Sequence, residues 1–94
     1  MNLRFFVDPA TDQPHIYNHD VDESEVQDIL EMPAEDRAGR DGARVAIGRT
    51  TGGRYLRVIY RREPASDEIV VITAYDLRGK PLRAFRRRKR RKRK

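Results

Sequence analysis

The stretch from Arg54 to Glu63 gathers the residue types best suited to chemistry on RNA. Its side chains alternate in character, as on a strand whose successive residues point to opposite faces. The apolar set consists of Leu56, Val58 and Tyr60. The opposite set consists of Tyr55, Arg57, Ile59 and Arg61. Because guanidinium groups bind phosphate bidentately and aromatic rings stack on bases, the second face suits single-stranded RNA. A solvated strand face carrying arginines is the alternative interpretation.

A small group of histidine, tyrosine and carboxylate side chains could move protons. His15 and His19 lie four residues apart, just before a predicted helix. Their functional interpretation is acid–base catalysis near neutral pH, and their structural interpretation is hydrogen bonding at the helix entry. A metal pair would need a third ligand, which is not apparent, so no metal site is predicted. Tyr60 and Tyr75 lie near the ends of adjacent predicted strands, where a core or edge aromatic is the alternative role. Asp76 is either a base or a turn residue.

The C-terminal end of the chain is strongly basic. Residues 81–94 contain ten Lys or Arg and no acid, whereas residues 1–80 contain eleven bases and fifteen acids, a net charge of −4. A run this dense favours contact with the phosphates of a nucleic acid, in a salt-dependent manner. An acidic partner protein, a membrane surface or the acidic helix of the same chain are alternatives. Leu82 and Phe85 could pin its start to the core, and like charges predict disorder beyond them.

These side chains must be positioned by a small α+β fold. Asp22 is a predicted N-cap with Glu25 in a capping-box arrangement, and Pro33 ends the pattern, which predicts a helix over residues 22–32. Alternating and apolar stretches predict four strands. They are Leu3–Val7, Ala43–Thr50, Arg54–Glu63 and Glu68–Tyr75. The last is the most apolar and is predicted to be central and buried on both faces.

The remaining stretches complete the predicted architecture. Residues 8–20 are a predicted polar connection, residues 33–42 a polar loop, and 82–94 a helix or a disordered arm. We expect an antiparallel sheet of about four strands, covered on one face by one or two helices and open on the other. The chain then divides into a single α+β domain, 1–80, and a basic helix or tail, 81–94.

The composition of the chain excludes several kinds of functional site. The chain has no cysteine, which excludes disulfides, thiolate metal ligands and a cysteine nucleophile. Residues 1–8 hold a short apolar run without a cleavage-site pattern, so no signal peptide is predicted, and no stretch is apolar for the ~20 residues that a membrane span needs. We therefore expect a cytoplasmic protein without a membrane partner and without a cofactor.

Four segments resemble the small bacterial RelE/BrnT-like toxin superfamily. They are H-x-x-x-H-D-V-x-E-x-E-V at 15–26, G-R-Y-L-R-V-I-Y at 53–60, V-I-T-A-Y at 71–75 and R-A-F-R-R-R at 83–88. The resemblance implies a RelE-like fold and the toxin of a type II toxin–antitoxin system. Such a toxin cuts mRNA, free or on the ribosome, without a metal, by attack of the ribose 2′-hydroxyl on the adjacent phosphate. It also implies a cognate antitoxin that covers the sheet face or displaces the C-terminal segment.

The same resemblance implies roles for individual residues. The implied phosphate clamps are Arg54, Arg57 and Arg61, with Arg83 or Arg86 as a second clamp. The implied proton-transfer groups are Tyr60, Tyr75 and His19. The basic tail adds the predicted nucleic-acid contacts Arg86, Arg87, Arg88, Lys89 and Arg90. Two other functions remain open: a non-catalytic RNA- or DNA-binding protein that uses its tail as an arm, and an interaction module whose acidic helix meets a basic partner.

Overall fold

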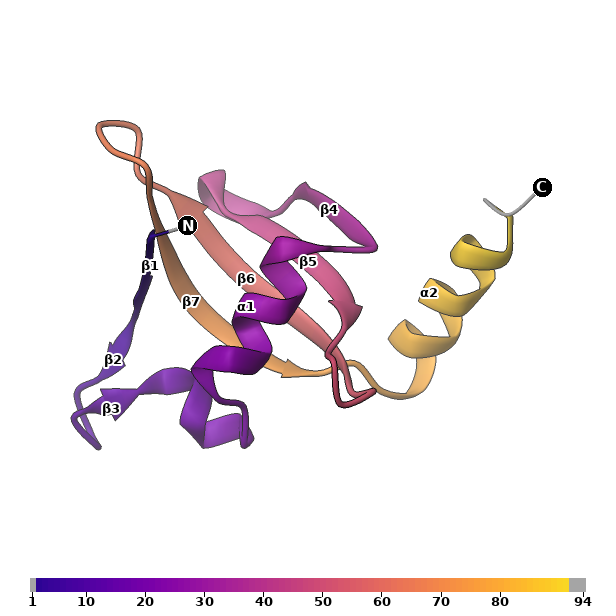
Figure 1. Cartoon of the computed structure of the whole chain (residues 1–94), viewed down its shortest axis with the longest axis horizontal. Helices are drawn as coiled ribbons and strands as arrows, with labels where there is room; N and C mark the ends of the chain where they lie inside the picture. Colours follow the sequence, from indigo (N-terminus) through magenta and orange to yellow (C-terminus); the bar gives the residue numbers. More distant parts are fainter. Residues whose placement is uncertain (1, 92–94) are drawn as a thin grey trace.

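The computed structural model describes residues 2–91, which form a five-stranded mixed sheet with helices on both of its faces (Figure 1). The strands lie in the order β1-β7-β6-β5-β4. Their bounds are β1 Asn2–Phe5, β4 Glu35–Ala38, β5 Arg44–Arg49, β6 Tyr55–Arg62 and β7 Glu68–Asp76. The helices are α1 Glu23–Glu31 and α2 Gly79–Arg91, with 3₁₀ turns η1 His15–His19 and η2 Arg40–Gly42. The predicted α+β class is confirmed.

The sheet differs from the prediction in size and direction. It has five strands rather than about four, and β1 pairs with β7 in parallel, whereas the other neighbours are antiparallel. The additional strand, β4, lies within the predicted loop 33–42. Its residues are polar and mostly exposed because it forms an edge of the sheet, where charged side chains are usual.

Helix α1 forms as its sequence predicts. The Asp22 carboxylate accepts a hydrogen bond from the Glu25 backbone N–H (2.9 Å), and the Glu25 carboxylate accepts one from the Asp22 N–H (3.1 Å). This capping box satisfies two of the donors that a helix start leaves unpaired. Val26 and Ile29 are fully buried against the sheet, in the main core.

The predicted polar connection 8–20 is more structured than expected. It contains a two-stranded hairpin, β2 Val7–Asp8 with β3 Gln13–Pro14, followed by η1. Ile16 of η1 is 1% exposed and belongs to the main core. One buried side chain therefore fastens this otherwise polar segment to the sheet beside β7, which is why it is not a loose loop.

The second face of the sheet was expected to be open, and this expectation is wrong for part of it. Helix α2 places Phe85, 1% exposed, in a second apolar cluster with β5 and β6. The buried members are Val45, Ile47, Leu77 and Phe85, with Tyr55, Ile59 and Leu82 packed against them. Strand β7 is likewise not buried on both faces: Val71 and Ala74 face the main core, while Val70 and Ile72 are only half-buried.

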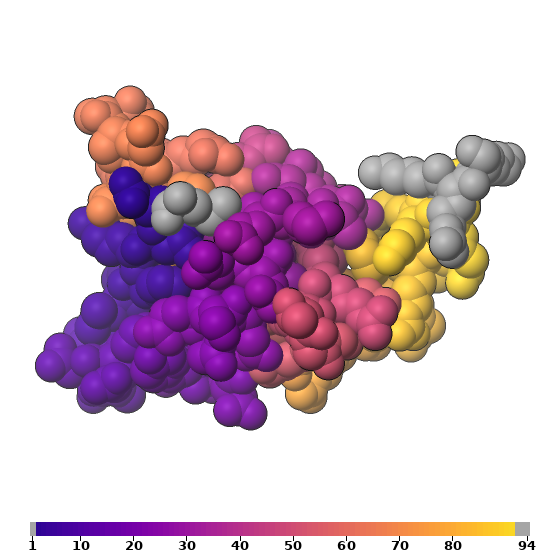
Figure 2. All heavy atoms as spheres, viewed as in Figure 1, coloured from indigo at the N-terminus to yellow at the C-terminus, as the bar shows by residue number. Residues whose placement is uncertain are grey.

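The basic segment is a helix for as far as the structure describes it. Its anchor residues Leu82 and Phe85 pack as predicted, whereas the disorder expected beyond them is not observed up to Arg91. The predicted tail residues 92–94 lie outside the described residues. Helix α2 projects from one end of a molecule with extents of 43 × 29 × 24 Å (Figure 2). Within residues 2–91, no helix is both long and apolar enough to span a membrane.

Candidate functional site

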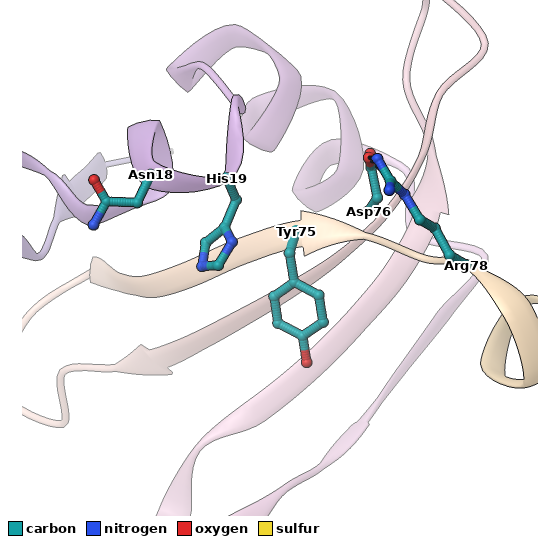
Figure 3. Close-up of a pocket in the computed structure, with 5 residues that line it drawn as sticks. All are labelled: Asn18, His19, Tyr75, Asp76 and Arg78. Atoms are coloured by element: carbon teal, nitrogen blue, oxygen red, sulfur yellow. Dashed lines mark hydrogen bonds and ion pairs between the residues drawn. The ribbon is translucent and has the colours of Figure 1, made fainter.

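A cleft of about 400 Å³ lies between η1 and the carboxyl end of β7. It is lined by Asn18, His19, Tyr75, Asp76 and Arg78 (Figure 3). The rings of His19 and Tyr75 lie on the same side of β7, with centroids 5.8 Å apart. The structure thus brings together two of the three predicted proton-transfer side chains.

The 3₁₀ turn that carries His19 is held by contacts along its whole length. Nδ1 of His15, its first residue, lies 3.3 Å from the Asp8 carboxylate, and Asn18, its fourth residue, donates to the same carboxylate (2.7 Å). A hydrogen bond from the Ala10 backbone N–H, together with the Asn18 amide, holds the pKa of Asp8 below its usual range. At its end, Asp20 takes a left-handed conformation (φ 59°), which turns the chain toward α1. His15 therefore contacts Asp8 near the entry to the helix, which agrees with a structural role, while His19 faces the cleft.

Arg54 joins the two segments that line the cleft. Its Nε donates to Asp76 (2.6 Å), and its Nη1 donates to the Asp20 carbonyl (2.6 Å) and to Glu25 of α1 (3.1 Å). Its Nη2 donates to the His19 carbonyl (3.3 Å). The Arg54 side chain is only 27% exposed. Four partners within the protein thus occupy the Arg54 guanidinium, and its role as a phosphate clamp stays a prediction.

The positive charge of Arg54 also affects the pKa of the neighbouring carboxylate of Asp76. Its guanidinium, above all, holds the pKa of Asp76 below the usual range, with help from Arg78. Asp76 accepts a hydrogen bond from Arg78 Nε (3.1 Å), and the two residues form an ion pair. The Arg78 side chain is 80% exposed, so it presents a cation at the mouth of the cleft.

Arg57 lies on the same sheet face as Tyr75. The two residues are directly paired across β6 and β7, so their side chains are neighbours about 5 Å apart at Cβ. Arg57 Nε is buried without a hydrogen-bond partner among residues 2–91. Arg61, four residues further along the same strand, is exposed and pairs with Val70 of β7. Arg57 thus remains a candidate phosphate contact beside the cleft, and Arg61 remains one further along the same strand.

Tyr60 is in a different environment. It is 1% exposed in the main core, on the α1 side of the sheet, and its hydroxyl donates to Asp36 (2.5 Å). Burial, together with this hydrogen bond, raises the pKa of Tyr60. Since Tyr60 and Tyr75 face opposite sides of the sheet, the structure does not bring Tyr60 to the cleft.

Helix α2 divides its basic residues between two faces. Four arginines with the spacing of one helical face line a shallow hollow of about 270 Å³: Arg83, Arg86, Arg87 and Arg90, here called the arginine stripe. None of the four makes an ion pair with any residue in the range 2–91. Arg86 also lies over the ring of Tyr55, 5.5 Å from its centroid.

Arg88 points away from the stripe. It forms a bidentate pair with Glu35 of β4 (2.8 and 2.9 Å), which raises the pKa of Arg88. This pair ties α2 to the edge of the sheet and takes Arg88 out of the predicted nucleic-acid contacts. Lys89 is exposed but does not line the hollow.

The sequence alone did not indicate Asn18 or Arg78 as site residues. Asn18 lies in the short 3₁₀ turn η1 and Arg78 in the two-residue connection between β7 and α2, so no periodic pattern assigns them a face. Within residues 2–91, no group of three or more His, Asp or Glu could hold a metal ion.

Comparison of the chain with protein-family models, with curated proteins and with solved structures finds no match in any of the three. The resemblance to RelE/BrnT-like toxins therefore stays a prediction.

Proposed function

We propose that this protein binds single-stranded RNA, with the arginine stripe of α2 as its main phosphate contact. The observation that carries the proposal is the absence of acidic partners at the stripe among residues 2–91, in a protein whose body is otherwise acidic. By contrast, two half-buried arginines of the same protein are matched to carboxylates, Arg54 to Asp76 and Arg88 to Glu35. A row of unmatched guanidiniums suits a chain of phosphates.

Single-stranded RNA fits better than a duplex because aromatic rings lie beside the cations. Tyr55 lies beneath Arg86, and Tyr75 opens into the cleft next to His19. Stacking on such rings needs unpaired bases, and it adds affinity without strong sequence preference.

Salt-dependent RNA binding tests this proposal. We expect the affinity for a fluorescent single-stranded RNA to fall with salt at a slope of about −3 in log–log form, since four contacts contribute roughly −0.7 each. Replacing all four stripe arginines with Gln should remove most of that slope. Replacing Arg4 and Arg37, exposed arginines on the two edge strands, is the control and should change it little. An unchanged slope in the stripe variant would refute the proposal.

The cleft supports a second function, a metal-independent endoribonuclease of the toxin–antitoxin type. In this reaction His19 takes the proton of a ribose 2′-hydroxyl, and the freed oxygen attacks the adjacent phosphorus. Arg57 and Arg78 stabilise the negative charge of the phosphorane, with Arg61 on the RNA beyond it. The Tyr75 hydroxyl gives its proton to the departing 5′-oxygen, so the products are a 2′,3′-cyclic phosphate and a 5′-hydroxyl.

This reaction has its own test. The purified protein should cut single-stranded RNA in excess EDTA, and expression without an antitoxin should arrest bacterial growth. His19→Gln and Tyr75→Phe should each slow cleavage by about 10²-fold or more, while RNA affinity stays within twofold. Tyr60→Phe is the matched control, because Tyr60 lies on the other side of the sheet. If the folded protein binds RNA, free and on ribosomes, without cutting it, the function is RNA binding alone.

A further inference from the structure

A second cavity lies on the sheet surface near the cleft, beside the β4–β5 connection. Its volume is about 360 Å³. It is lined by Gly39, Arg40, Ala43, Val45, Arg57 and Ile59. This size falls at the lower end of small-ligand pockets, ~300–1,000 Å³, and suits one nucleotide rather than a larger ligand.

The charge of this cavity selects an anionic ligand. Its lining contains two arginines and no acid, and neither Arg40 nor Arg57 forms an ion pair with any described residue. Arg57 Nε is also a buried donor without a hydrogen-bond partner among residues 2–91. A buried unpaired donor costs free energy, which a ligand acceptor would recover if a small movement of the Arg57 side chain admitted it.

The rest of the lining is apolar. Val45 and Ile59 come from the neighbouring strands β5 and β6, where they are directly paired, and Ala43 adds a small side chain. A flat aliphatic surface beside guanidiniums suits a ligand with a planar ring and a phosphate. A phosphate alone would leave the aliphatic surface uncovered.

The cavity adjoins the cleft between η1 and β7. Arg57 lines the cavity, and its direct neighbour across the strands, Tyr75, lines the cleft. The two hollows thus adjoin at a single cross-strand pair, so one RNA strand could place consecutive nucleotides in them.

We propose that the cavity between Arg40, Arg57 and Ile59 binds one unpaired nucleotide of the RNA, the neighbour of the nucleotide held in the His19–Tyr75 cleft. Its base lies on Val45 and Ile59, and its phosphate lies between the two guanidiniums. This inference rests on the proposed RNA-binding function and adds to it a subsite that selects the base beside the cleft.

Methyl NMR of the full-length protein tests the subsite directly. AMP, GMP, CMP and UMP are titrated separately while the Val45 and Ile59 methyl signals are followed, with inorganic phosphate as the ligand control. We expect at least one nucleotide to shift both signals in a saturable manner, and phosphate to leave them in place. Arg40→Glu should lower the affinity for that nucleotide about tenfold, and Arg40→Gln should lower it less. Arg37→Glu, the same charge change on β4 outside the cavity, should stay within twofold of the parent.

The outcomes separate this inference from the proposed function. If single-stranded RNA binds with the salt slope expected for the stripe, but no nucleotide shifts the Val45 or Ile59 signals, the subsite is refuted and RNA binding stands. If nucleotides shift these methyls while single-stranded RNA does not bind, the cavity is a nucleotide site and the proposed function fails. A response of the two methyls to inorganic phosphate equal to that for every nucleotide also overturns the subsite, because it would show an anion site without a base contact.

Discussion

Replacing Arg54 is the most informative single perturbation of this protein. Its guanidinium holds α1 through Glu25, the end of β7 through Asp76, and η1 through the carbonyls of His19 and Asp20. Arg54→Lys keeps the charge but has a single nitrogen, so it can hold one carboxylate and not all four partners. Arg54→Gln removes the charge as well. The two variants therefore separate the charge of Arg54 from its geometry.

The expected loss of stability follows from the contacts. Hydrogen bonds to charged groups contribute about 1.5–3 kcal/mol each, and the three side chains are only 20–27% exposed. Asp76 keeps its contact with Arg78 in both variants, so not all of this energy is lost. We expect the free energy of unfolding to fall by about 3 kcal/mol in Arg54→Gln and by about 2 kcal/mol in Arg54→Lys. For a domain of this size 2 kcal/mol lowers Tm by roughly 8–16 °C. Thermal unfolding followed by circular dichroism measures this change.

The pH dependence gives an independent measurement of the same interaction. Arg54 lowers the pKa of Asp76 in the folded state, so the interaction is fully present above the unfolded pKa of about 3.9. It is lost as the pH falls through the lower folded pKa. The stability difference between the parent and Arg54→Gln should therefore be constant from pH 5 to 8 and shrink below about pH 4.

The position of His19 supplies the decisive observation. We expect the nuclear Overhauser contact between the His19 and Tyr75 rings to weaken in Arg54→Lys at a temperature where the variant is folded. Arg88→Lys is the control, because it removes another bidentate pair far from the cleft. A loss below about 0.5 kcal/mol with an intact ring contact would show that Arg54 does not organise the cleft.

Three further predictions concern the core, the helix and the reaction. Phe85→Ala should destabilise the protein by about 3–4 kcal/mol and reduce the helical circular dichroism signal, since α2 loses its main anchor; an unchanged spectrum and midpoint would contradict this. Tyr60→Phe should cost about 1–2 kcal/mol in denaturant unfolding, because Asp36 loses a hydrogen-bond donor; a neutral effect would mean that water replaces the hydroxyl. If the cleft is catalytic, the RNA products of the parent should end in a 2′,3′-cyclic phosphate, and an unchanged cleavage rate in His19→Gln would exclude His19 as the base.

Local sequence signals predict the elements that depend on local interactions. The capping box at Asp22 predicts the start of α1, and alternation predicts β5, β6 and β7 to within one or two residues. In contrast, β4 is polar and its place at the edge depends on pairing with β5. The parallel pairing of β1 with β7 likewise joins segments at opposite ends of the chain, for which no local pattern exists.

The candidate site shows the same difference between local signals, which the sequence reveals, and long-range contacts, which it does not. Arg54 and Arg57 carry the same implied role as phosphate clamps, but only Arg54 meets acids from elsewhere in the fold. Those acids, Asp76 and Glu25, lie 22 and 29 residues away. The contact between His19 and Tyr75 is also made by segments distant in the chain. Alternation correctly placed Tyr60 in the core, and this position separates it from the cleft.

The placement of α2 at one end of the molecule has a consequence for how the protein meets a polyanion. Residues 5–36 contain ten acids and no Lys or Arg, and their β2–β3 hairpin lies at the end opposite α2 (Figure 1). The long axis is 43 Å, whereas charges are screened over about 8 Å at physiological salt. An approaching phosphate chain therefore senses one end at a time, attractive at α2 and repulsive at the hairpin. The protein is therefore an electric dipole. If it binds RNA as proposed, this dipole turns α2 toward the RNA before contact, and added salt should slow association more than it speeds release.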